Sequence, residues 1–437
     1  MYLLDLVSFA ALVILVGSVQ GRDQISASEK CLQPLTQGNQ EICPSLSPKR
    51  KILAPNVLNH DQKPLSNANR DEFKFGEEDE EDEYELPPGW QGPQHCIGDF
   101  CMYWNTDVGD GIALISTQRI AWLAANFPIP QSRQVEPTAY YERQIPGKGV
   151  GLIANRTIRK GEIIMERTPT LLIVMKSHVS LDANVREKLY EAALGRLPEQ
   201  AAQKFMRQYG ETIIAKVDKN SFRMPLDGKE PHSEHFAVFP DVSRMNHDCR
   251  PNVHYRLSSL THTSIAVRDI NPGEELTVSY IYGRNVRAER QKQLSSIWGF
   301  DCTCTQCSLP DLESMASDAR VREIRKLEKE IEDKMATNNG RDVRPEMGGR
   351  LIQLYLDERL EAYMAPTYTR AALMYSMFGN EEKALEYAKE AVAALEREYG
   401  EQAGDVVSMR ELLADVKGHW SWSIKVRKPR TNKDKGK

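Results

Sequence analysis

Four cysteines in the chain have the type and spacing of a zinc site. Cys302, Cys304 and Cys307 supply three thiols within six residues, which is too crowded for disulfides among themselves but well spaced for one zinc ion. Structural zinc usually has four protein ligands, and Cys249 is the only other cysteine beyond Cys101. The sequence therefore predicts one structural zinc ion that joins Cys249 to the later triplet.

Three further segments carry groups that could take part in chemistry. Asn-His-Asp-Cys-Arg-Pro-Asn spans 246–252, Gly-Glu-Glu-Leu-Thr-Val-Ser-Tyr spans 273–280, and a Gly-Lys-Gly-Val-Gly turn spans 147–151. Glycines in such a turn allow the backbone to approach a ligand closely. Each feature also has a purely structural explanation. The glycine turn could be an ordinary tight hairpin, the Asn-His pair a structural turn, and Tyr280 a half-buried core residue. Phe300, which precedes the cysteine triplet, could make an ordinary apolar contact.

Together and in this order, the motifs resemble those of the SET-domain protein-lysine methyltransferases. The resemblance covers roughly residues 136–310 and includes Arg-Lys-Gly-Glu at 159–162. In that family the Asn-His loop and the Gly-Glu-Glu-Leu segment form a knotted active site, which a Cys-x-Cys-x-x-Cys post-SET zinc site closes. The zinc finger of the SET-and-MYND branch is absent, because no cysteine lies between Cys101 and Cys249.

The resemblance implies a role for each candidate residue. Tyr280 would be catalytic, positioning and polarising the methyl group rather than removing a proton, since a free phenol has a pKa of about 10. Phe300 would pack on the adenine ring of the cofactor, and the zinc would be structural because four thiolates leave no open ligand position. The residues expected to contact S-adenosylmethionine are Gly149, Val150, Gly151, Asn246, His247, Tyr280 and Phe300.

Methyl transfer to lysine makes specific demands on such a site. A neutral amine must meet the sulfonium methyl in line, so orientation supplies much of the acceleration. The lysine ammonium has a reference pKa of about 10.4, and a narrow apolar channel would disfavour this charged form by desolvation. Tyr282 is a weaker candidate for the wall of that channel.

The predicted function is S-adenosylmethionine-dependent protein-lysine N-methylation, with a lysine-containing protein as substrate. The alternative is a catalytically inactive, secreted, zinc-stabilised SET-like module that binds peptides. Its main support is the apolar run 6–16, followed by small residues that permit signal-peptidase cleavage after Gly21. This run is short for a membrane span, and Asp5 stands where a basic residue is usual. The sequence favours the secretory pathway, with the nucleus or cytoplasm as the alternative.

Composition limits other classes of function. Charged residues make up 27% of the chain and the net charge is −5, so no direct nucleic-acid site is evident.

The N-terminal region holds an even number of cysteines, as two disulfides would need; the alternative is four free thiols. These cysteines are Cys31, Cys43, Cys96 and Cys101, of which Cys96 and Cys101 are close enough in sequence to join a short hairpin.

The predicted fold class is α+β: a knotted SET fold of short strands with a helical insertion, a post-SET zinc loop and a C-terminal α-helical domain. The helices expected over 369–378 and 381–398 form a hairpin that resembles a tetratricopeptide-type unit, with a plain helical bundle as the alternative. This domain is a possible surface for a protein partner. The expected boundaries are a signal-like segment at 1–21, a linker at 22–95, a hairpin-helix segment at 96–135, a SET domain at 136–285 with a helical insertion at about 177–235, a post-SET segment at 286–310, a helical domain at 311–420 and a basic tail at 421–437.

Overall fold

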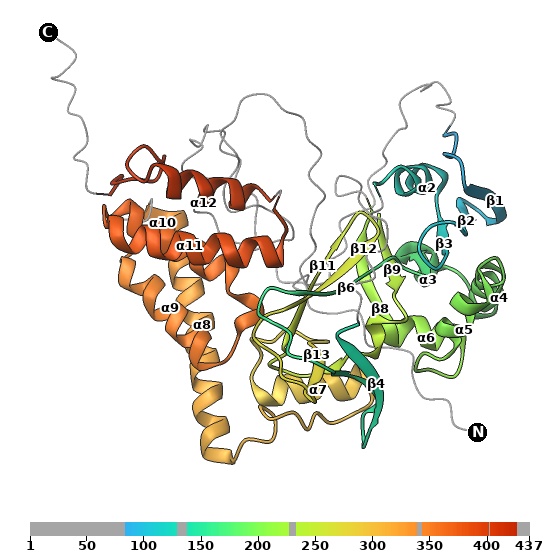
Figure 1. The fold of residues 1–437 in the computed structure, drawn as a ribbon, viewed down its shortest axis with the longest axis horizontal. Helices are drawn as coiled ribbons and strands as arrows, with labels where there is room; N and C mark the ends of the chain where they lie inside the picture. The colour runs from blue at the N-terminus through green and yellow to red at the C-terminus, as the bar shows by residue number, and fades with distance from the viewer. Residues whose placement is uncertain (1–83, 129–137, 227–232, 339–342, 402, 426–437) are drawn as a thin grey trace, which may run out of the picture.

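The structure is a computed structural model that describes residues 84–128, 138–226, 233–338, 343–401 and 403–425. The signal-like segment, Cys31, Cys43, most of the expected linker and the end of the basic tail lie outside the described residues. Within the described part, three β-sheets and eleven α-helices form a mixed α/β fold (Figure 1). None of the helices in this part is long and apolar enough to cross a membrane.

The largest sheet has the strand order β1-β2-β3-β7-β9-β8. The Cys96–Cys101 disulfide closes the β1–β2 hairpin, as the short spacing suggested. Because β1 pairs with β2 and begins at the buried Trp90, the linker predicted over 22–95 extends too far. The strands are β1 Trp90–Ile97, β2 Phe100–Asn105, β3 Ile112–Ser116, β7 Leu171–Val174, β8 Ser221–Pro225 and β9 Glu234–Val238.

Two smaller sheets bring the motif-bearing segments together. The first has the order β10-β13-β5-β4, in which the short β10 runs parallel to β13. In the second, β11-β12-β6, Ser259 and Leu260 adopt positive φ in the tight turn between β11 and β12, so β12 begins at Thr261. These strands are β4 Tyr140–Ile145, β5 Gly149–Ala154, β6 Ile163–Arg167, β10 Asn246–His247, β11 Val253–Ser258, β12 Thr261–Ala266 and β13 Glu275–Val278.

The insertion between β7 and β9 is built from several short helices. Two helices cover most of 183–206; they are separate because Gly195 ends the first and Pro198 precedes the second, where proline cannot continue a helix. Strand β8 also lies within the insertion, so it is not wholly helical. The helices are α2 Gln118–Ala125 ahead of the insertion, then α3 Met175–Ser180, α4 Ala183–Leu194, α5 Glu199–Met206 and α6 Ile213–Asn220.

The C-terminal region is helical, as predicted. The expected α10–α11 hairpin is present, with Asn380 capping α11 through the backbone N–H of Lys383. The knot and the tetratricopeptide-type repeat stay predictions. The helices are α7 Arg287–Trp298, α8 Asp311–Asn338, α9 Pro345–Asp357, α10 Ala365–Met377, α11 Glu381–Glu398 and the unpredicted α12 Gly404–Ala414, with short 3-10 helices at Val242–Arg244 and Glu361–Tyr363.

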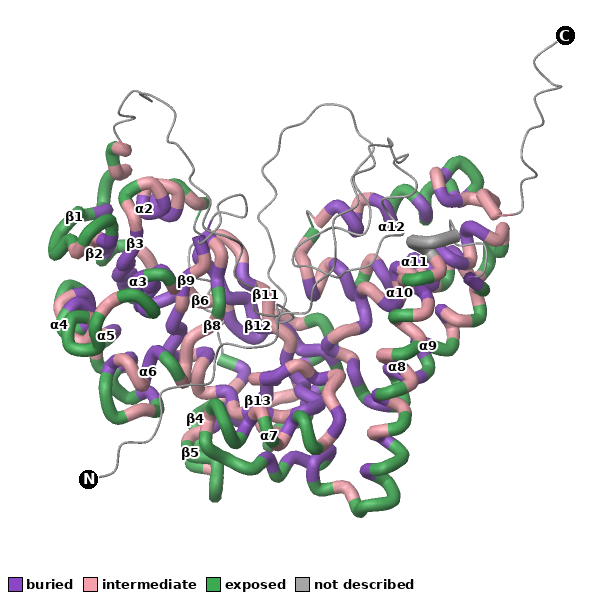
Figure 2. Tube along the Cα trace, turned by 180° about the vertical axis from the view of Figure 1, so that it is seen from behind, coloured by how far each residue is buried: buried purple, intermediate pink, exposed green. Residues whose placement is uncertain are grey.

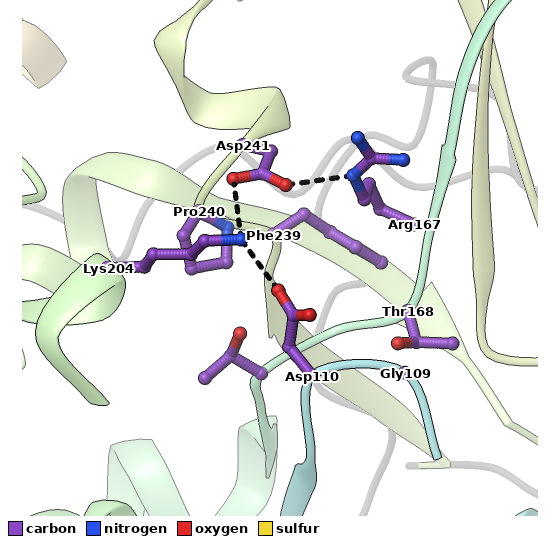
Figure 3. A pocket seen from close by; sticks show the side chains of 9 residues that line it. Gly109, Asp110, Arg167, Thr168, Lys204, Phe239, Pro240 and Asp241 are labelled. Atoms are coloured by element: carbon purple, nitrogen blue, oxygen red, sulfur yellow. Dashed lines mark hydrogen bonds and ion pairs between the residues drawn. The ribbon is translucent and has the colours of Figure 1, made fainter. Parts of the chain in front are cut away.

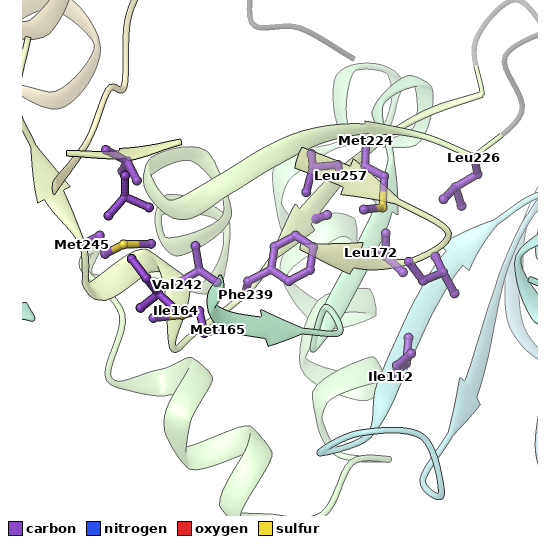
Figure 4. Packing of buried hydrophobic residues seen from close by; sticks show 14 of the residues in the cluster. Ile112, Ile164, Met165, Leu172, Met224, Leu226, Phe239, Val242, Met245 and Leu257 are labelled. Carbon is purple, nitrogen blue, oxygen red and sulfur yellow. The ribbon is translucent and has the colours of Figure 1, made fainter. Parts of the chain in front are cut away.

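One apolar core connects the sheets and supports the motif segments. Ile112 and Leu172 from the large sheet and Phe239, directly after β9, pack with Leu257 of β11 and with Met245, which directly precedes the Asn-His pair (Figure 4). Many residues of the strands are buried and are purple in Figure 2. Helices α4–α6 lie on one side of these strands and helices α8–α12 on the other. Burial of these apolar side chains stabilises the segments that flank the candidate site.

Candidate functional site

The structure brings the four cysteines into one buried cluster. Their sulfur atoms all lie within 4.8 Å of one another, and Sγ of Cys249 is 3.5 Å from Sγ of Cys307. A tetrahedral zinc ion with Zn–S bonds of about 2.3 Å would separate its sulfur ligands by about 3.8 Å. The spacing and the four-thiol donor set therefore fit one structural zinc. Cys249 follows β10, and the triplet follows α7.

Two side chains of α7 support this cluster. Arg290 is 1% exposed, and its Nη2 donates to Sγ of Cys307 at 3.7 Å; its charge offsets negative charge on the thiolates. Gln291 accepts a hydrogen bond from the backbone N–H of Cys302 and donates one to its carbonyl, at 2.7 and 2.8 Å. Hydrogen bonds from Cys249 and Cys302 lower the pKa of the Cys304 thiol to about 5.

His247 connects the cysteine cluster to Tyr280. Burial lowers the pKa of His247 to about 4, so the ring is neutral at neutral pH. Its Nδ1 accepts the backbone N–H of Tyr280 at 3.0 Å, which places the ring proton on Nε2. That nitrogen lies 3.3 Å from Sγ of Cys249 and can donate to it. A single ring thus fixes the position of Tyr280 relative to the cluster.

Tyr280 lies just beyond the end of β13, between two aromatic rings. Its ring centroid is 5.4 Å from that of His247 and 5.3 Å from that of Trp298. The hydroxyl donates to the carbonyl of Met245 at 2.8 Å. Burial raises the pKa of the phenol above its ordinary value, so the hydroxyl stays protonated and presents its lone pairs to a neighbouring group.

The glycine turn lies next to Asn246 at the start of β5. Nδ2 of Asn246 donates to Oε1 of Glu275 at 2.8 Å and lies 3.5 Å from the carbonyl of Val150. A Cβ added at Gly151 would come within 2.8 Å of Nδ2 of Asn246, so this approach requires glycine. Gly149, at φ +76°, adopts the conformation that favours glycine.

Phe300 completes the set of predicted residues. It is 36% exposed, and its ring centroid lies 6.4 Å from that of His247. The residue follows Gly299, whose φ of +78° ends α7. The exposed ring next to His247 is available to pack against a ligand. Tyr282, the weaker candidate, instead has the guanidinium of Arg284 stacked 4.4 Å from its ring centroid.

Several residues at the site were not singled out from the sequence. Glu275 accepts hydrogen bonds from Asn246 and from Lys148, the latter at 3.0 Å. Asn252 accepts the backbone N–H of Thr277 and donates to the carbonyl of Glu275, both at 2.8 Å, which joins the Asn-His loop to β13. Both residues lie within the quoted motifs, so the motifs were the available signal.

Asp248, for which the sequence suggested no role, forms a hydrogen bond within the Asn-His loop. It accepts the backbone N–H of Arg250 at 2.8 Å, a side-chain-to-backbone bond typical of Asx turns. Burial raises its pKa to about 6. Asp248 therefore shapes the loop that carries Cys249.

A separate small cavity of about 70 Å³ lies at the end of β9 (Figure 3). Its charges satisfy one another: Lys204 lies 2.7 Å from Asp110 and 3.5 Å from Asp241, and Arg167 lies 2.8 Å from Asp241. None of the predicted site residues lines it. This cavity is therefore distinct from the candidate methyl-transfer site.

Comparison with known proteins identifies one domain in this region. The family model described as the SET domain matches residues 149–281. The chain contains a SET domain. The match confirms the resemblance to SET-domain protein-lysine methyltransferases. It starts at Gly149 and includes Tyr280, whereas Phe300 and the cysteine triplet follow it.

The chain is also similar to curated proteins named as lysine methyltransferases. N-lysine methyltransferase SMYD2-B of Danio rerio is 28% identical over 216 residues, which cover 48% of this chain and 49% of the relative. N-lysine methyltransferase SMYD2 of Homo sapiens is 32% identical over 189 residues, covering 42% of each chain. Histone-lysine N-methyltransferase SMYD1 of Homo sapiens is 30% identical, covering 38% of this chain and 37% of the relative. The matched region thus spans half or less of these relatives.

Proposed function

We propose that this SET-domain protein is an S-adenosylmethionine-dependent protein-lysine N-methyltransferase. The observation that carries the proposal is the convergence of Asn246, His247 and Tyr280 beside the four-cysteine cluster, where His247 is hydrogen-bonded to both Cys249 and Tyr280. The SET-domain match and the relatives named as lysine methyltransferases support the same conclusion. The substrate would be a lysine side chain of a protein.

S-adenosylmethionine, when bound, would supply an electrophilic methyl group on its sulfonium. Gly149, Val150 and Gly151 would hold its amino-acid end together with the Asn246–His247 loop, and Phe300 would cover the adenine. Asn246 has one amide hydrogen on Glu275, which fixes the orientation of its carboxamide. These residues bind and orient; none of them needs to exchange a proton.

Tyr280 would position the reacting groups. Its single hydroxyl proton is committed to the carbonyl of Met245, so the oxygen can only accept hydrogen bonds from the amine or the polarised methyl. Because burial raises the pKa of the phenol, a tyrosinate base is not needed and is disfavoured. The lysine must arrive neutral, and the aromatic rings of Tyr280 and Trp298 would disfavour its ammonium form by desolvation.

The cysteine cluster would hold one structural zinc ion. Cys249, Cys302, Cys304 and Cys307 would bind it with no open position for substrate. Its role would be to fix Phe300 relative to the Asn-His loop. We also propose that the C-terminal helical region offers a surface for a protein partner.

The alternative, an inactive secreted binding module, draws support from one structural feature. The Cys96–Cys101 disulfide is of the kind that persists in oxidising compartments. We propose entry into the secretory pathway, with the nucleus or cytoplasm as the alternative. This question of location is separate from catalysis, because the methyl-transfer residues are all present.

The substitution Tyr280→Phe tests the proposed activity. We expect the affinity for S-adenosylhomocysteine, measured by calorimetry, to stay within about twofold, while transfer of labelled methyl groups to lysine-containing peptides falls by roughly 100-fold or more, because the lost hydroxyl acts mainly in the transition state. Tyr282→Phe is the matched control and should retain activity. A wild-type chain that binds no S-adenosylhomocysteine would favour the binding module, and unchanged turnover in Tyr280→Phe would remove that residue from the mechanism.

A further inference from the structure

A buried arginine extends from the Asn-His loop into the C-terminal helices. The side chain of Arg250, next to Cys249 in sequence, is 1% exposed. Its Nη1 donates to the carbonyls of Cys249 and Gly283 at 2.8 and 2.9 Å. One guanidinium therefore ties the loop that carries a zinc ligand to the segment that follows Tyr280.

The counter-charge for this arginine comes from the helical region. Glu358, directly after α9, has a fully buried side chain. Its Oε2 accepts Nη2 of Arg250 at 2.7 Å, and its Oε1 accepts Nε of Arg320 at 2.7 Å. The backbone carbonyl of Glu358 also accepts Nε of Arg250. The carboxylate is thus fully used, and it fixes the plane of the Arg250 guanidinium.

A second buried route leads from the same carboxylate to the cysteine triplet. Ser317 of α8 donates to Oε2 of Glu358 at 2.8 Å and accepts from Nε2 of Gln306 at 2.7 Å. Gln306 stands between Cys304 and Cys307 in sequence and is 4% exposed. The carboxylate of Glu358 is therefore linked to both segments of the cysteine cluster. Arg250 connects it to the loop of Cys249, and Ser317 and Gln306 connect it to the triplet.

We propose that Glu358 is a positioning residue for the methyl-transfer site, acting on the cysteine cluster from the C-terminal helical region. This inference rests on the proposed function and deepens it. Glu358 holds the Asn-His loop and the triplet at a fixed separation, and so sets the position of Tyr280 relative to Phe300. The helical region is part of the machinery that builds the site, in addition to any surface that it offers to a partner.

Physical chemistry explains why this contact is more than ordinary packing. A buried carboxylate is stable only when it is paired and its remaining lone pairs accept hydrogen bonds, and Glu358 meets both conditions. Removal of its charge leaves the guanidinium of Arg250 buried without a counter-ion. Arg250 would then relax toward water, and its bonds to the carbonyls of Cys249 and Gly283 would weaken with it.

The test compares Glu358→Gln with Glu323→Gln in the full chain. Glu323 forms an α8–α9 ion pair with Arg350 at 2.8 Å, and both side chains are about half exposed, so it controls for charge loss in the same helices. Two quantities are measured: the rate at which a chelator removes zinc, and kcat and KM for methylation of a lysine peptide. For Glu358→Gln we expect roughly tenfold faster zinc loss and roughly tenfold lower kcat, with KM nearly unchanged, as expected from losing one charged hydrogen bond. Glu323→Gln should match the wild type in both.

A milder variant keeps the test decisive if Glu358→Gln fails to fold. Ser317→Ala removes the hydroxyl between Gln306 and Glu358 and leaves every charge in place, so roughly threefold faster zinc loss is expected from one neutral hydrogen bond. A folded Glu358→Gln chain with wild-type zinc release and kcat would overturn the proposal, as would wild-type behaviour of Ser317→Ala where Glu358→Gln does not fold. A wild-type chain with neither zinc nor methyl transfer would instead refute the proposed function itself.

Discussion

Glu398 offers a quantitative test of how the helical region is stabilised. This residue ends α11 and is 4% exposed. Its Oε1 accepts the backbone N–H of Ala365 at 3.0 Å, at the start of α10. Burial raises the pKa of Glu398 from its ordinary 4.5 to about 8, against the opposing effect of the backbone hydrogen bonds and the charge of Arg397.

The direction of the pH effect follows from this raised pKa. Between its unfolded and folded pKa values the folded chain binds the proton more tightly than the unfolded chain. The stability that depends on neutral Glu398 is therefore complete below about pH 4.5, falls as the pH rises, and is lost above about pH 8. At about 1.4 kcal/mol per pKa unit, the total loss is on the order of 4–5 kcal/mol.

The substitution Glu398→Gln should remove this dependence. The amide oxygen can still accept the N–H of Ala365, and the side chain cannot ionise. Calorimetric unfolding at pH 5, 7 and 9 should show the variant close to the wild type at pH 5 and melting several degrees higher at pH 9, at roughly 2–4 °C per kcal/mol. Glu396→Gln, which loses a partly exposed pair with Arg410, should show no such trend. A wild-type–variant difference that is constant from pH 5 to 9 would refute the reasoning.

Two further predictions concern the candidate site. The chain should bind one zinc ion, and Arg290→Met should weaken zinc binding by roughly 10- to 100-fold in competition with a chelator, because it removes one charged hydrogen bond to Cys307; equal affinity would exclude Arg290 from stabilising the thiolates. Gly151→Ala should weaken S-adenosylhomocysteine binding in calorimetry by roughly tenfold or more, since the new Cβ would meet the side chains of Asn246 and Ile145 and force them to move. Unchanged binding would show that the turn can widen at no cost to the ligand.

The features that the sequence predicted well depend on local pattern or on rare residue types. Four cysteines beyond Cys101 left one combination for a four-ligand site, and the structure gathers those four. Short apolar runs such as 171–174 and the hairpin of α10 and α11 follow from strand and helix patterns and from the Gly379-Asn380 turn. Such signals need no knowledge of the rest of the fold.

The features that the sequence missed depend on partners distant along the chain. β1 has a polar, glycine- and proline-containing sequence that reads as linker, and it is a strand because β2 lies beside it. Nothing local to Arg250 indicates that its charge is matched by Glu358, which lies 108 residues later.

In three contacts between the SET domain and the helical region, an arginine of the SET domain donates to an acceptor on the helices. Arg250 donates to Glu358, Arg284 to Glu328, and Arg256 to the carbonyls of Glu396 and Arg397 at the end of α11. In each case the SET domain supplies the cation, and the helices supply a carboxylate or the negative end of a helix dipole. The side chain of Arg250 is 1% exposed in the folded chain, so loss of the charge of Glu358 alone would leave a buried, unpaired guanidinium, at a cost of roughly 3–5 kcal/mol. That is a large share of the 5–15 kcal/mol that stabilises a typical domain. Three arginines of the segment that holds the candidate site therefore have their counter-charges or hydrogen-bond acceptors in the helices that follow it.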